Sequence, residues 1–486
     1  MLLCLSGDFF VATFQECSVH FCDFKIYEVN ELMKQKNGFS GQLGFVFAAA
    51  GSAVGVGNLW RFPYLAAKDG GGLFLIIYLI LVFTVGFTLL TTDIAIGRKT
   101  GKSAIYAYQE MKKKWKFLGI LTFFVPVLIM TYYAVIGGWI LKYITIYLTG
   151  SGKEAVESNC FTNFISSPSS VWFGLIFMFL TALIVYNGVE KGIERVSKFI
   201  MPILLLMVIG IAIFSLTLKH PLEDGTVRTG LQGLKVYLTP DVKGLTVTRF
   251  LQISLDAMSQ LFFSLSVSMG IMITYGSYVK KDVNLSKSIS QIELMDTGVA
   301  LLAGVMIIPA VYVFSGLDGM SAGPGLMFIS LPNVFYSMGL AGRIIGLMFC
   351  ISVLESITAN CMELFHAERK KVTSILTVIY LAATAIIAMG YSTFYVEVQL
   401  PSGSTGQLLD IMDYISNSFL MPFIALLSSI LIGWIVKPSW IAAEMELNGE
   451  TFRRKKLYNV MIRYIMPVIM FILFLQSTGL LNKIAG

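Results

Sequence analysis

The feature that most constrains this chain is the recurrence of long apolar stretches from about residue 41 to near its end. Each is long enough to cross the hydrocarbon core of a bilayer, which is about 30 Å thick. Backbone N–H and C=O groups in that core must be satisfied within the chain, and helices achieve this without the alternating pattern of a β-barrel. We predict an all-α membrane protein with eleven transmembrane helices, at roughly 41–67, 72–97, 117–149, 170–187, 192–218, 249–279, 287–316, 342–366, 371–390, 407–437 and 457–480.

The charge distribution also indicates a membrane protein. Charged residues make up 13% of the chain, against about 25% in a typical soluble domain. The net charge of +7 does not indicate nucleic-acid binding, because no basic groove with interleaved aromatics appears. The basic residues instead cluster in alternate loops, after the second, fourth, sixth, eighth and tenth spans. The positive-inside rule places these loops in the cytoplasm, which predicts an internal N-terminus and an external C-terminus.

The chain divides into a leader, residues 1–37, and a single transmembrane domain, residues 38–486. The leader lacks the basic start of a secretory signal and carries Asp8. Two interpretations stay open: a disordered segment, or an upstream start with Met33 as the first residue of the protein. Residues 318–341, rich in glycine and proline, are expected to form a folded external loop.

Patterns typical of enzymes are missing from the sequence. Its three histidines lie in the leader or near loops, and its six cysteines have no metal-ligand spacing. No glycine-rich phosphate loop followed by Lys-Ser/Thr appears, which argues against an ATP-driven pump. We therefore expect a protein that is not an enzyme.

Two spans are interrupted near their middle. In the first, Gly51, Gly55 and Gly57 accompany Ser52 and Asn58, and each glycine costs about 1 kcal/mol in a helix interior relative to alanine. The sixth span has a comparable interruption at residues 264–270. Broken helices in corresponding positions of two five-helix halves indicate the midplane site of a secondary transporter. The alternative is that the glycines only pack helices closely.

Such interruptions have a definite chemistry. The N-terminus of a half-helix carries partial positive charge and free N–H groups, which suit a carboxylate. Exposed carbonyls, with the hydroxyls of Ser264 and Ser266, suit a hard cation such as sodium. The site is therefore expected to bind a zwitterion together with a cation.

Three segments resemble the neurotransmitter:sodium symporter family, of the bacterial leucine-transporter type. They are GSAVGVGNLWRFPYLAAKDGGG from Gly51, FFSLSVSMGIMITYGSY from Phe262 and LDIMDYISNSFLMP from Leu409. The resemblance runs from about Gly38 to the end, and eleven spans match a common bacterial variant. It implies a 5+5 inverted-repeat core with broken helices 1 and 6, two sodium sites, and uptake of amino acids or related amines by alternating access.

The resemblance implies a first sodium site formed by Ala53, Asn58, Ser264 and Asp296. Many members have asparagine in place of Asp296, and those coupled to chloride have a serine where this chain has Ala300. An acid within a membrane span is a functional candidate. We hypothesise that Asp296 supplies the negative charge that chloride supplies in animal relatives, so chloride is not expected; a protonated structural aspartate is the alternative.

The second sodium site is expected at Gly51, Val54, Ser352, Glu355 and Ser356. Family members have a Thr-Ser or Ser-Ser pair where this chain reads Glu355-Ser356, or Ser356-Ile357 in a shifted register. The departure leaves the number of sodium ions open, at one or two. Three roles stay open for Glu355: a ligand of sodium, a protonatable group that couples proton movement, or a neutral structural residue.

By resemblance, the substrate pocket is largely apolar, which favours a hydrophobic or aromatic amino acid because a charged side chain would lack a partner there. Tyr133 is expected to bind the substrate carboxylate, although an isolated tyrosine in a span is often a packing residue. The expected pocket residues are Ser52, Ala53, Val56, Gly57, Ile129, Tyr133, Phe263, Ser264, Ser266, Met269, Ser356 and Asn360.

The resemblance also implies gates. Arg61 and Asp413 are expected to close the external vestibule above a lid of Tyr133 and Phe263, unless they form a static packing pair. Tyr278 is expected at the inner gate, with Phe39, Lys36 and an acid such as Glu368. Asp93 is expected to hydrogen-bond the unwound backbone, a structural role.

The sequence therefore predicts a sodium-coupled amino-acid symporter of the bacterial cytoplasmic membrane. Its partners are an amino acid, sodium ions and the bilayer, with no nucleic acid, and a homodimer is left open. The alternative is a transport-inactive receptor or sensor on the same scaffold, which the unusual eighth span favours.

Overall fold

The computed structural model describes residues 39, 41–53, 55, 57–157, 159–186, 193–222, 225–317, 319, 326–365, 370–401 and 405–481. The leader predicted at residues 1–37 lies outside these residues, as do Lys36, Val54, Val56 and Glu368.

The described chain is almost entirely helical, as the apolar stretches predict. Its first half contains α3 (Gln42–Ala53), η2 (Gly57–Arg61), α4 (Phe62–Lys68), α5 (Gly72–Leu81), η3 (Val82–Gly86), α6 (Phe87–Thr100), α7 (Ala104–Met111), η4 (Lys113–Trp115), α8 (Lys116–Thr149), η5 (Glu154–Val156), α9 (Cys160–Ile165), α10 (Pro168–Tyr186), α11 (Ile193–Thr217) and α12 (Gly230–Leu238). The second half contains α13 (Val247–Ser264), α14 (Ile271–Ser277), α15 (Leu285–Ser315), α16 (Leu326–Ser337), α17 (Leu340–Phe365), α18 (Lys370–Met389), α19 (Leu408–Asp413), η8 (Tyr414–Leu420), α20 (Met421–Ile430), η9 (Leu431–Val436), α21 (Ser439–Met445), η10 (Leu447–Gly449), α22 (Lys455–Val460), η11 (Met461–Ile465) and α23 (Met466–Ser477).

Among the residues that the structure describes, strands occur in two small antiparallel hairpins. The first pairs β1 (Lys219–Pro221) with β2 (Val227–Thr229), and the second pairs β3 (Val398–Gln399) with β4 (Thr405–Gly406). Both lie in connections between helices, so the bundle itself is all-α.

Several helices have the length and apolarity of membrane spans. The described residues contain seven such helices, or eight if the pair α3 and η2–α4, bent by 45°, forms one span. Large apolar side chains such as Trp172, Phe179 and Phe471 are exposed on their outer faces. Such a surface suits lipid rather than water. The count of eleven spans stays a prediction.

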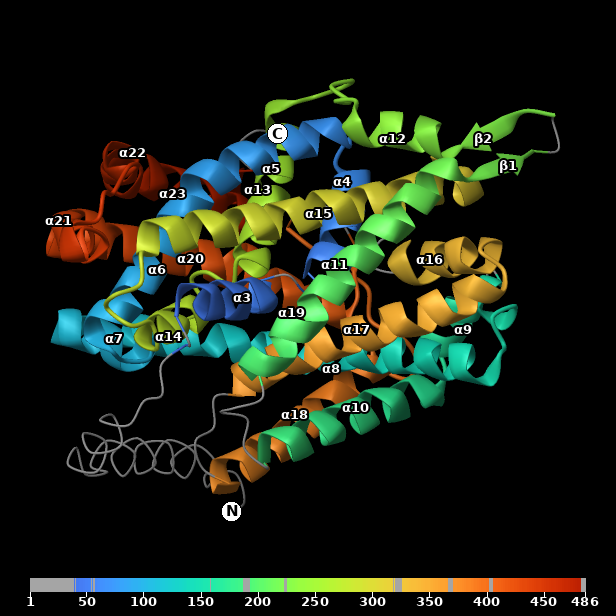
Figure 1. The fold of residues 1–486 in the computed structure, drawn as a ribbon, viewed down its shortest axis with the longest axis horizontal. Helices are drawn as coiled ribbons and strands as arrows, with labels where there is room; N and C mark the ends of the chain where they lie inside the picture. Colours follow the sequence, from blue (N-terminus) through green and yellow to red (C-terminus); the bar gives the residue numbers. More distant parts are fainter. Residues whose placement is uncertain are drawn as a thin grey trace, which may run out of the picture.

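The helices run roughly parallel and pack in pairs (Figure 1). Helix α8 packs against α10 and α17, α11 against α15, and α6 against α14. Figure 1 shows α7, α14 and α21 at one end of the bundle and α9, α16 and the β1–β2 hairpin at the other. The basic run at residues 112–116 lies at the first of these ends. The predicted external loop at 318–341 contributes α16 to the second end.

Helices α13 and α14 are separated by a short non-helical segment, residues 265–270. Within it, Ser266, Ser268 and Gly270 all have positive φ, at 51°, 61° and 83°. This conformation costs a residue other than glycine roughly 1–2 kcal/mol. The segment therefore has to be held by its surroundings, and Asp93 Oδ2 accepts a hydrogen bond of 2.8 Å from the Ser268 N–H.

Candidate functional site

A small cavity lies between the end of α3, the middle of α8 and the region where α13 gives way to α14. The predicted pocket residues that line it come from α3, the start of η2, α8, the end of α13 and the segment after it: Ser52, Ala53, Gly57, Ile129, Tyr133, Phe263, Ser266 and Met269. Ile271 at the start of α14 also lines the cavity and was not predicted. Its walls are mainly apolar, with backbone and two serines on one side.

The cavity is covered by two aromatic rings. The rings of Tyr133 and Phe263 meet edge to face, with centroids 5.7 Å apart. Gly57 makes room for this arrangement, since a Cβ at that position would lie 2.7 Å from Cδ1 of Phe263. The lack of a side chain at Gly57 therefore lets the Phe263 ring lie flat against η2.

Next to the cavity lies a fully buried polar cluster from three helices. The Asn58 amide donates to Asp296 Oδ1 at 2.8 Å and to the Asp296 carbonyl at 2.9 Å. The Ser264 hydroxyl lies 2.7 Å from the same Oδ1 and 2.8 Å from Asn58 Oδ1. The other carboxylate oxygen, Asp296 Oδ2, is buried and has no hydrogen-bond partner among the described residues.

This donor set fits a small hard cation. It consists of carboxylate, amide and hydroxyl oxygens. Ala53, predicted for the same site, is the last residue of α3, where helix carbonyls lack partners within the helix. Oxygen ligands of this kind suit alkali and alkaline-earth ions rather than softer metals. The described residues contain no cluster of three His, Cys, Asp or Glu residues that would hold a transition metal.

Some residues predicted for the pocket do not line the cavity, and others lie outside the residues that the structure describes. Ser264 belongs to the polar cluster rather than to the cavity wall. Ser356 is buried on α17. Asn360 lies in α17, but its side chain is outside the described part of the structure, and so is the whole of Val56.

The residues predicted for a second sodium site lie on two helices that contact each other, α3 and α17. Gly51 belongs to α3, and Ser352 and Ser356 are buried on α17. Glu355, also on α17, is only partly buried, and within the described chain it makes no hydrogen bond or ion pair. Val54 lies outside the described residues.

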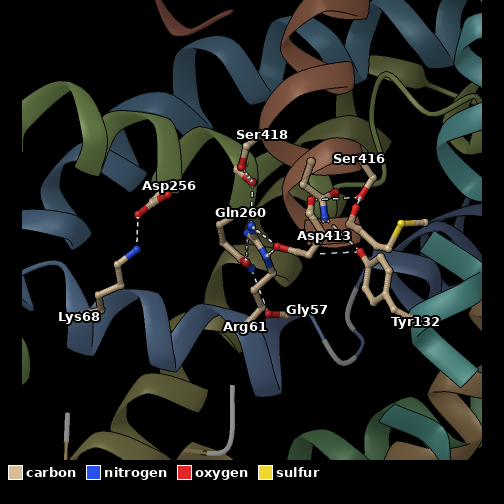
Figure 2. A network of polar contacts seen from close by, with 12 residues as sticks. Gly57, Arg61, Lys68, Tyr132, Asp256, Gln260, Asp413, Ser416 and Ser418 are labelled. Atoms are coloured by element: carbon tan, nitrogen blue, oxygen red, sulfur yellow. Dashed lines mark hydrogen bonds and ion pairs between the residues drawn. The ribbon is translucent and has the colours of Figure 1, made fainter. Parts of the chain in front are cut away.

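Arg61 and Asp413, the predicted outer gate, form a buried ion pair (Figure 2). Arg61 Nη2 and Nε lie 3.0 and 3.2 Å from Asp413 Oδ2. The guanidinium carbon is also 5.7 Å from the centre of the Phe263 ring. One arginine therefore contacts both the opposing helix α19 and the lid.

Four residues that the sequence reasoning missed complete this pair. Arg61 donates to Ser259 Oγ at 2.7 Å and to Gln260 Oε1 at 3.3 Å. On the other side, Asp413 Oδ1 accepts from Tyr132 at 3.2 Å and from Asn417 at 2.7 Å. Tyr132 adjoins Tyr133, Ser259 and Gln260 lie about one helical turn before Phe263, and Asn417 lies one helical turn after Asp413. This spacing was the available signal.

Two further contacts were not predicted. Gln260 donates to the Gly57 carbonyl at 3.0 Å, next to the interruption of the first span. Farther along α4, Lys68 forms a 2.8 Å ion pair with Asp256 on α13, to the left of the Arg61–Asp413 pair in Figure 2. Both contacts join the half-helix that follows the first interruption to α13.

The Tyr278 ring lies at the opposite end of the bundle, beside Phe39. Phe39 stacks on Tyr275 with centroids 5.7 Å apart and meets Tyr278 edge-on at 6.4 Å. The Phe39 N–H also donates to the Tyr278 carbonyl at 3.4 Å. The other residues expected there, Lys36 and Glu368, lie outside the described residues.

Known proteins resemble this chain in both sequence and structure. The model of the sodium:neurotransmitter symporter family matches residues 36–168 and 156–484. YhdH, a sodium-dependent transporter of Bacillus subtilis, is 34% identical over 464 residues, which is 91% of this chain and 98% of the relative. The human sodium- and chloride-dependent GABA transporter 2 is 23% identical over 462 residues, covering 82% of this chain and 73% of the transporter.

Among solved structures, the crystal structure of MhsT in complex with L-phenylalanine matches with a TM-score of 0.80. The two chains are 32% identical, and the match covers 90% of this chain and 99% of that one. The fold, the buried polar cluster and the matched length agree: this chain belongs to the sodium:neurotransmitter symporter family, whose members are membrane transporters and not enzymes.

Proposed function

We propose that this protein is a symporter that uses a sodium gradient to carry a hydrophobic or aromatic amino acid into a bacterial cell by alternating access. The observation that carries the proposal is the cluster of Asn58, Ser264 and Asp296 beside an apolar cavity. Its free carboxylate oxygen, Asp296 Oδ2, supplies a buried negative charge for the ion.

Sodium and substrate are coupled because their sites share parts of the chain. Ala53 lines the cavity and also ends α3 beside Asn58, and Ser264 follows directly after the lid residue Phe263. A substrate carboxylate placed against this backbone lies close to the bound cation. Each ligand then raises the affinity of the site for the other, and the coupling is reciprocal.

The substrate is proposed to be apolar because of the cavity walls. Ile129, Phe263, Met269 and Ile271 surround the space, and no charged side chain lines it among the described residues. A charged substrate side chain would lose its hydration without gaining a partner. The complex of MhsT with L-phenylalanine, an apolar aromatic amino acid, agrees with this preference.

The arrangement in the membrane follows from the same proposal. Eleven spans with a 5+5 inverted-repeat core place the interruptions after Ala53 and Ser264 at the bilayer midplane, as secondary transporters require. The basic run at residues 112–116 then lies on the cytoplasmic side of the inner membrane, together with α7, α14 and α21.

In the proposed cycle, the arrangement of the two predicted gates corresponds to a state that is closed on the outer side. Arg61 and Asp413 close it above the lid, and Phe39 packs against Tyr278 at the inner end. Transport requires that the two ends open in turn, so the Arg61–Asp413 pair has to separate in each cycle. An ion pair serves this purpose because water can replace its hydrogen bonds when the vestibule opens.

The function is tested by uptake of a panel of radiolabelled amino acids into proteoliposomes, with and without an inward sodium gradient. We expect gradient-dependent accumulation of an apolar or aromatic amino acid, and none of charged ones. Accumulation without sodium would contradict the proposal. Binding without accumulation under any gradient would instead identify a receptor or sensor on this scaffold.

The gate predicts a specific effect of Arg61→Lys. Lysine keeps the charge but lacks the planar fork that contacts Asp413, Ser259 and Gln260 together. We expect the closed gate to lose about 1.4 kcal/mol of stability in this variant, which corresponds to a fall of about tenfold in uptake. Sodium-dependent substrate binding should persist, which separates a gating defect from a lost site.

The matched control for this exchange is Lys102→Arg. Lys102 pairs with Glu110 at 2.6 Å, and both side chains are substantially exposed. Such surface pairs contribute about 0–1 kcal/mol, so the variant should transport like the wild type. Normal uptake by Arg61→Lys would show that the Arg61–Asp413 pair is a static packing contact.

The proposed role of Asp296 predicts how transport depends on chloride. Wild-type uptake should be the same in chloride and in gluconate, because the carboxylate supplies the negative charge. Asp296→Asn keeps an oxygen ligand but removes this charge, so its uptake should fall in gluconate and recover in part when chloride is restored. A chloride requirement in the wild type would refute this role.

We propose Glu355 as an anionic ligand of a second sodium ion, because it lies on α17 where that helix contacts α3 and makes no other polar contact in the described chain. Glu355→Gln should then reduce the number of sodium ions transported per substrate by one. The ratio is measured from paired sodium-22 and substrate fluxes in proteoliposomes. An unchanged ratio would exclude a ligand role.

A further inference from the structure

The buried acids in the described part of the chain fall into two groups. Members of the first group each contact a basic side chain within 3.0 Å: Asp69 with Arg249, Asp256 with Lys68, Glu293 with Arg454, Asp413 with Arg61, and Glu444 with Arg98. Asp93 and Asp296 are equally buried, at 1% and 0% exposure, and have no basic partner within the described residues. Each of these two acids therefore needs another way to neutralise its charge.

The surroundings of the two acids differ. Asp296 meets the amide of Asn58 and the hydroxyl of Ser264 in a set of oxygens that suits a metal ion. Within the described chain, Asp93 accepts one hydrogen bond, from the Ser268 N–H at 2.8 Å, and no set of oxygen ligands surrounds it. A proton, which needs no further ligands, is the cation that fits Asp93.

The basic residues nearest to Asp93 along α6 are engaged elsewhere. Arg98 bonds to Glu444 and to the Val283 carbonyl, both at 2.7 Å. Lys99 donates to the Trp440 carbonyl at 2.7 Å and lies over the Trp440 ring. Neither can pair with Asp93 while α21 stays in place, so an ionised Asp93 would be an isolated charge inside the bundle.

Asp93 lies at a boundary between two packed groups of helices. On one side, α6 and α14 touch through their backbones, because a Cβ on Gly97 would overlap the Ile273 carbonyl oxygen. On the other side are α7, α20 and α22, which contribute Tyr108, Ser428 and Tyr458. We call this boundary the α6 seam. It is bridged by hydroxyl contacts, such as the 2.9 Å contact of Thr92 with Tyr458.

The titratable groups that face Asp93 are the phenols of Tyr108 and Tyr458. The other titratable groups on elements that pack on α6 are Tyr275 on α14, Glu444 on α21 bound to Arg98, the exposed Tyr106 and Glu110 on α7, with Glu110 bound to Lys102, and Glu293, Asp296 and the exposed Lys287 on α15, with Glu293 bound to Arg454. No member of this set supplies a positive charge to Asp93. The surroundings of the carboxyl group are polar but uncharged.

We propose that Asp93 is a proton-binding site whose occupancy controls closure of the inner half of the transporter. In the closed structure Asp93 is a neutral carboxylic acid. When the pair α6–α14 moves away from α7, α20 and α22, water enters the α6 seam from the α7 end. The O–H bond of Asp93 then breaks and its proton passes to that water.

Closing the seam reverses this step. Asp93 has to take a proton from internal water before it is buried again, because burying the bare carboxylate is costly. The return of the empty transporter therefore slows when the inside is alkaline. This consequence rests on the proposed transport cycle, whereas the protonation of Asp93 in the closed structure does not.

The test measures sodium-driven uptake into proteoliposomes at fixed external pH while the internal pH is varied. Wild-type uptake should fall as the inside becomes alkaline, approaching about tenfold per pH unit beyond the midpoint if proton binding limits the cycle. Asp93→Asn, which keeps an oxygen acceptor for the Ser268 N–H but cannot ionise, should show no such dependence, whatever its absolute rate. Asp93→Glu should restore the dependence.

Infrared spectroscopy supplies a readout that needs no transport and that a merely structural role would not move. The wild type should show the C=O band of a protonated carboxylic acid, absent in Asp93→Asn and shifted in Asp93→Glu. Tyr458→Phe, which removes a neighbouring hydroxyl, should shift the band without abolishing it.

The proposal is overturned if Asp93→Asn keeps the wild-type dependence on internal pH, or if its spectrum retains every protonated-acid band. Absence of sodium-driven uptake in the wild type would refute the transport function, while the spectrum would still decide the state of Asp93.

Discussion

Polar groups inside this apolar bundle have to find partners within the chain, because lipid offers none. The constraint applies first to the interruptions, where backbone N–H and C=O groups lose their helical partners. Gln260 donates to the Gly57 carbonyl at the first interruption, and Asp93 accepts from the Ser268 N–H at the second. Each interruption is therefore held by a side chain from another helix, and this fixes the positions of the walls of the cavity.

The same constraint explains why the buried charged side chains Arg61 and Asp296 lie beside the cavity among polar partners. Arg61 donates hydrogen bonds to Asp413, Ser259 and Gln260. Its positive charge is therefore compensated, although the residue is only 2% exposed. Asp296 is compensated only in part, since one oxygen has no partner within the described residues. A buried anion with such an oxygen attracts a cation, and in the proposed function a zwitterion in the neighbouring cavity shares that cation.

The sequence was sufficient to predict a helical membrane protein and to identify Asn58, Ser264 and Asp296, which the structure brings into contact from three helices. The first prediction rested on apolar length, and the second on the resemblance to the neurotransmitter:sodium symporter family. Gln260 and Tyr132 were missed because a polar residue in a span has no periodic signature that reveals its partner. Their partners are Arg61 and Asp413, and Arg61 lies 199 residues from Gln260 in the chain. The number of spans was not fixed either, because short helices such as α14 fall below the length of a span.

Gln260 connects the gate to the site, and this connection bears on how the two work together. Its amide oxygen accepts from Arg61, while its amide nitrogen donates to the carbonyl of Gly57, one residue before Asn58. A shift of the backbone at Asn58 when sodium binds would be passed to Arg61 through two hydrogen bonds and one rigid amide. Lys68 and Asp256 join the same two helices farther out, so α4 and α13 are held at two points. In the proposed transport cycle, closure of the outer gate moves this joined pair toward α19, so the Arg61–Asp413 contact and the backbone beside the cavity change together.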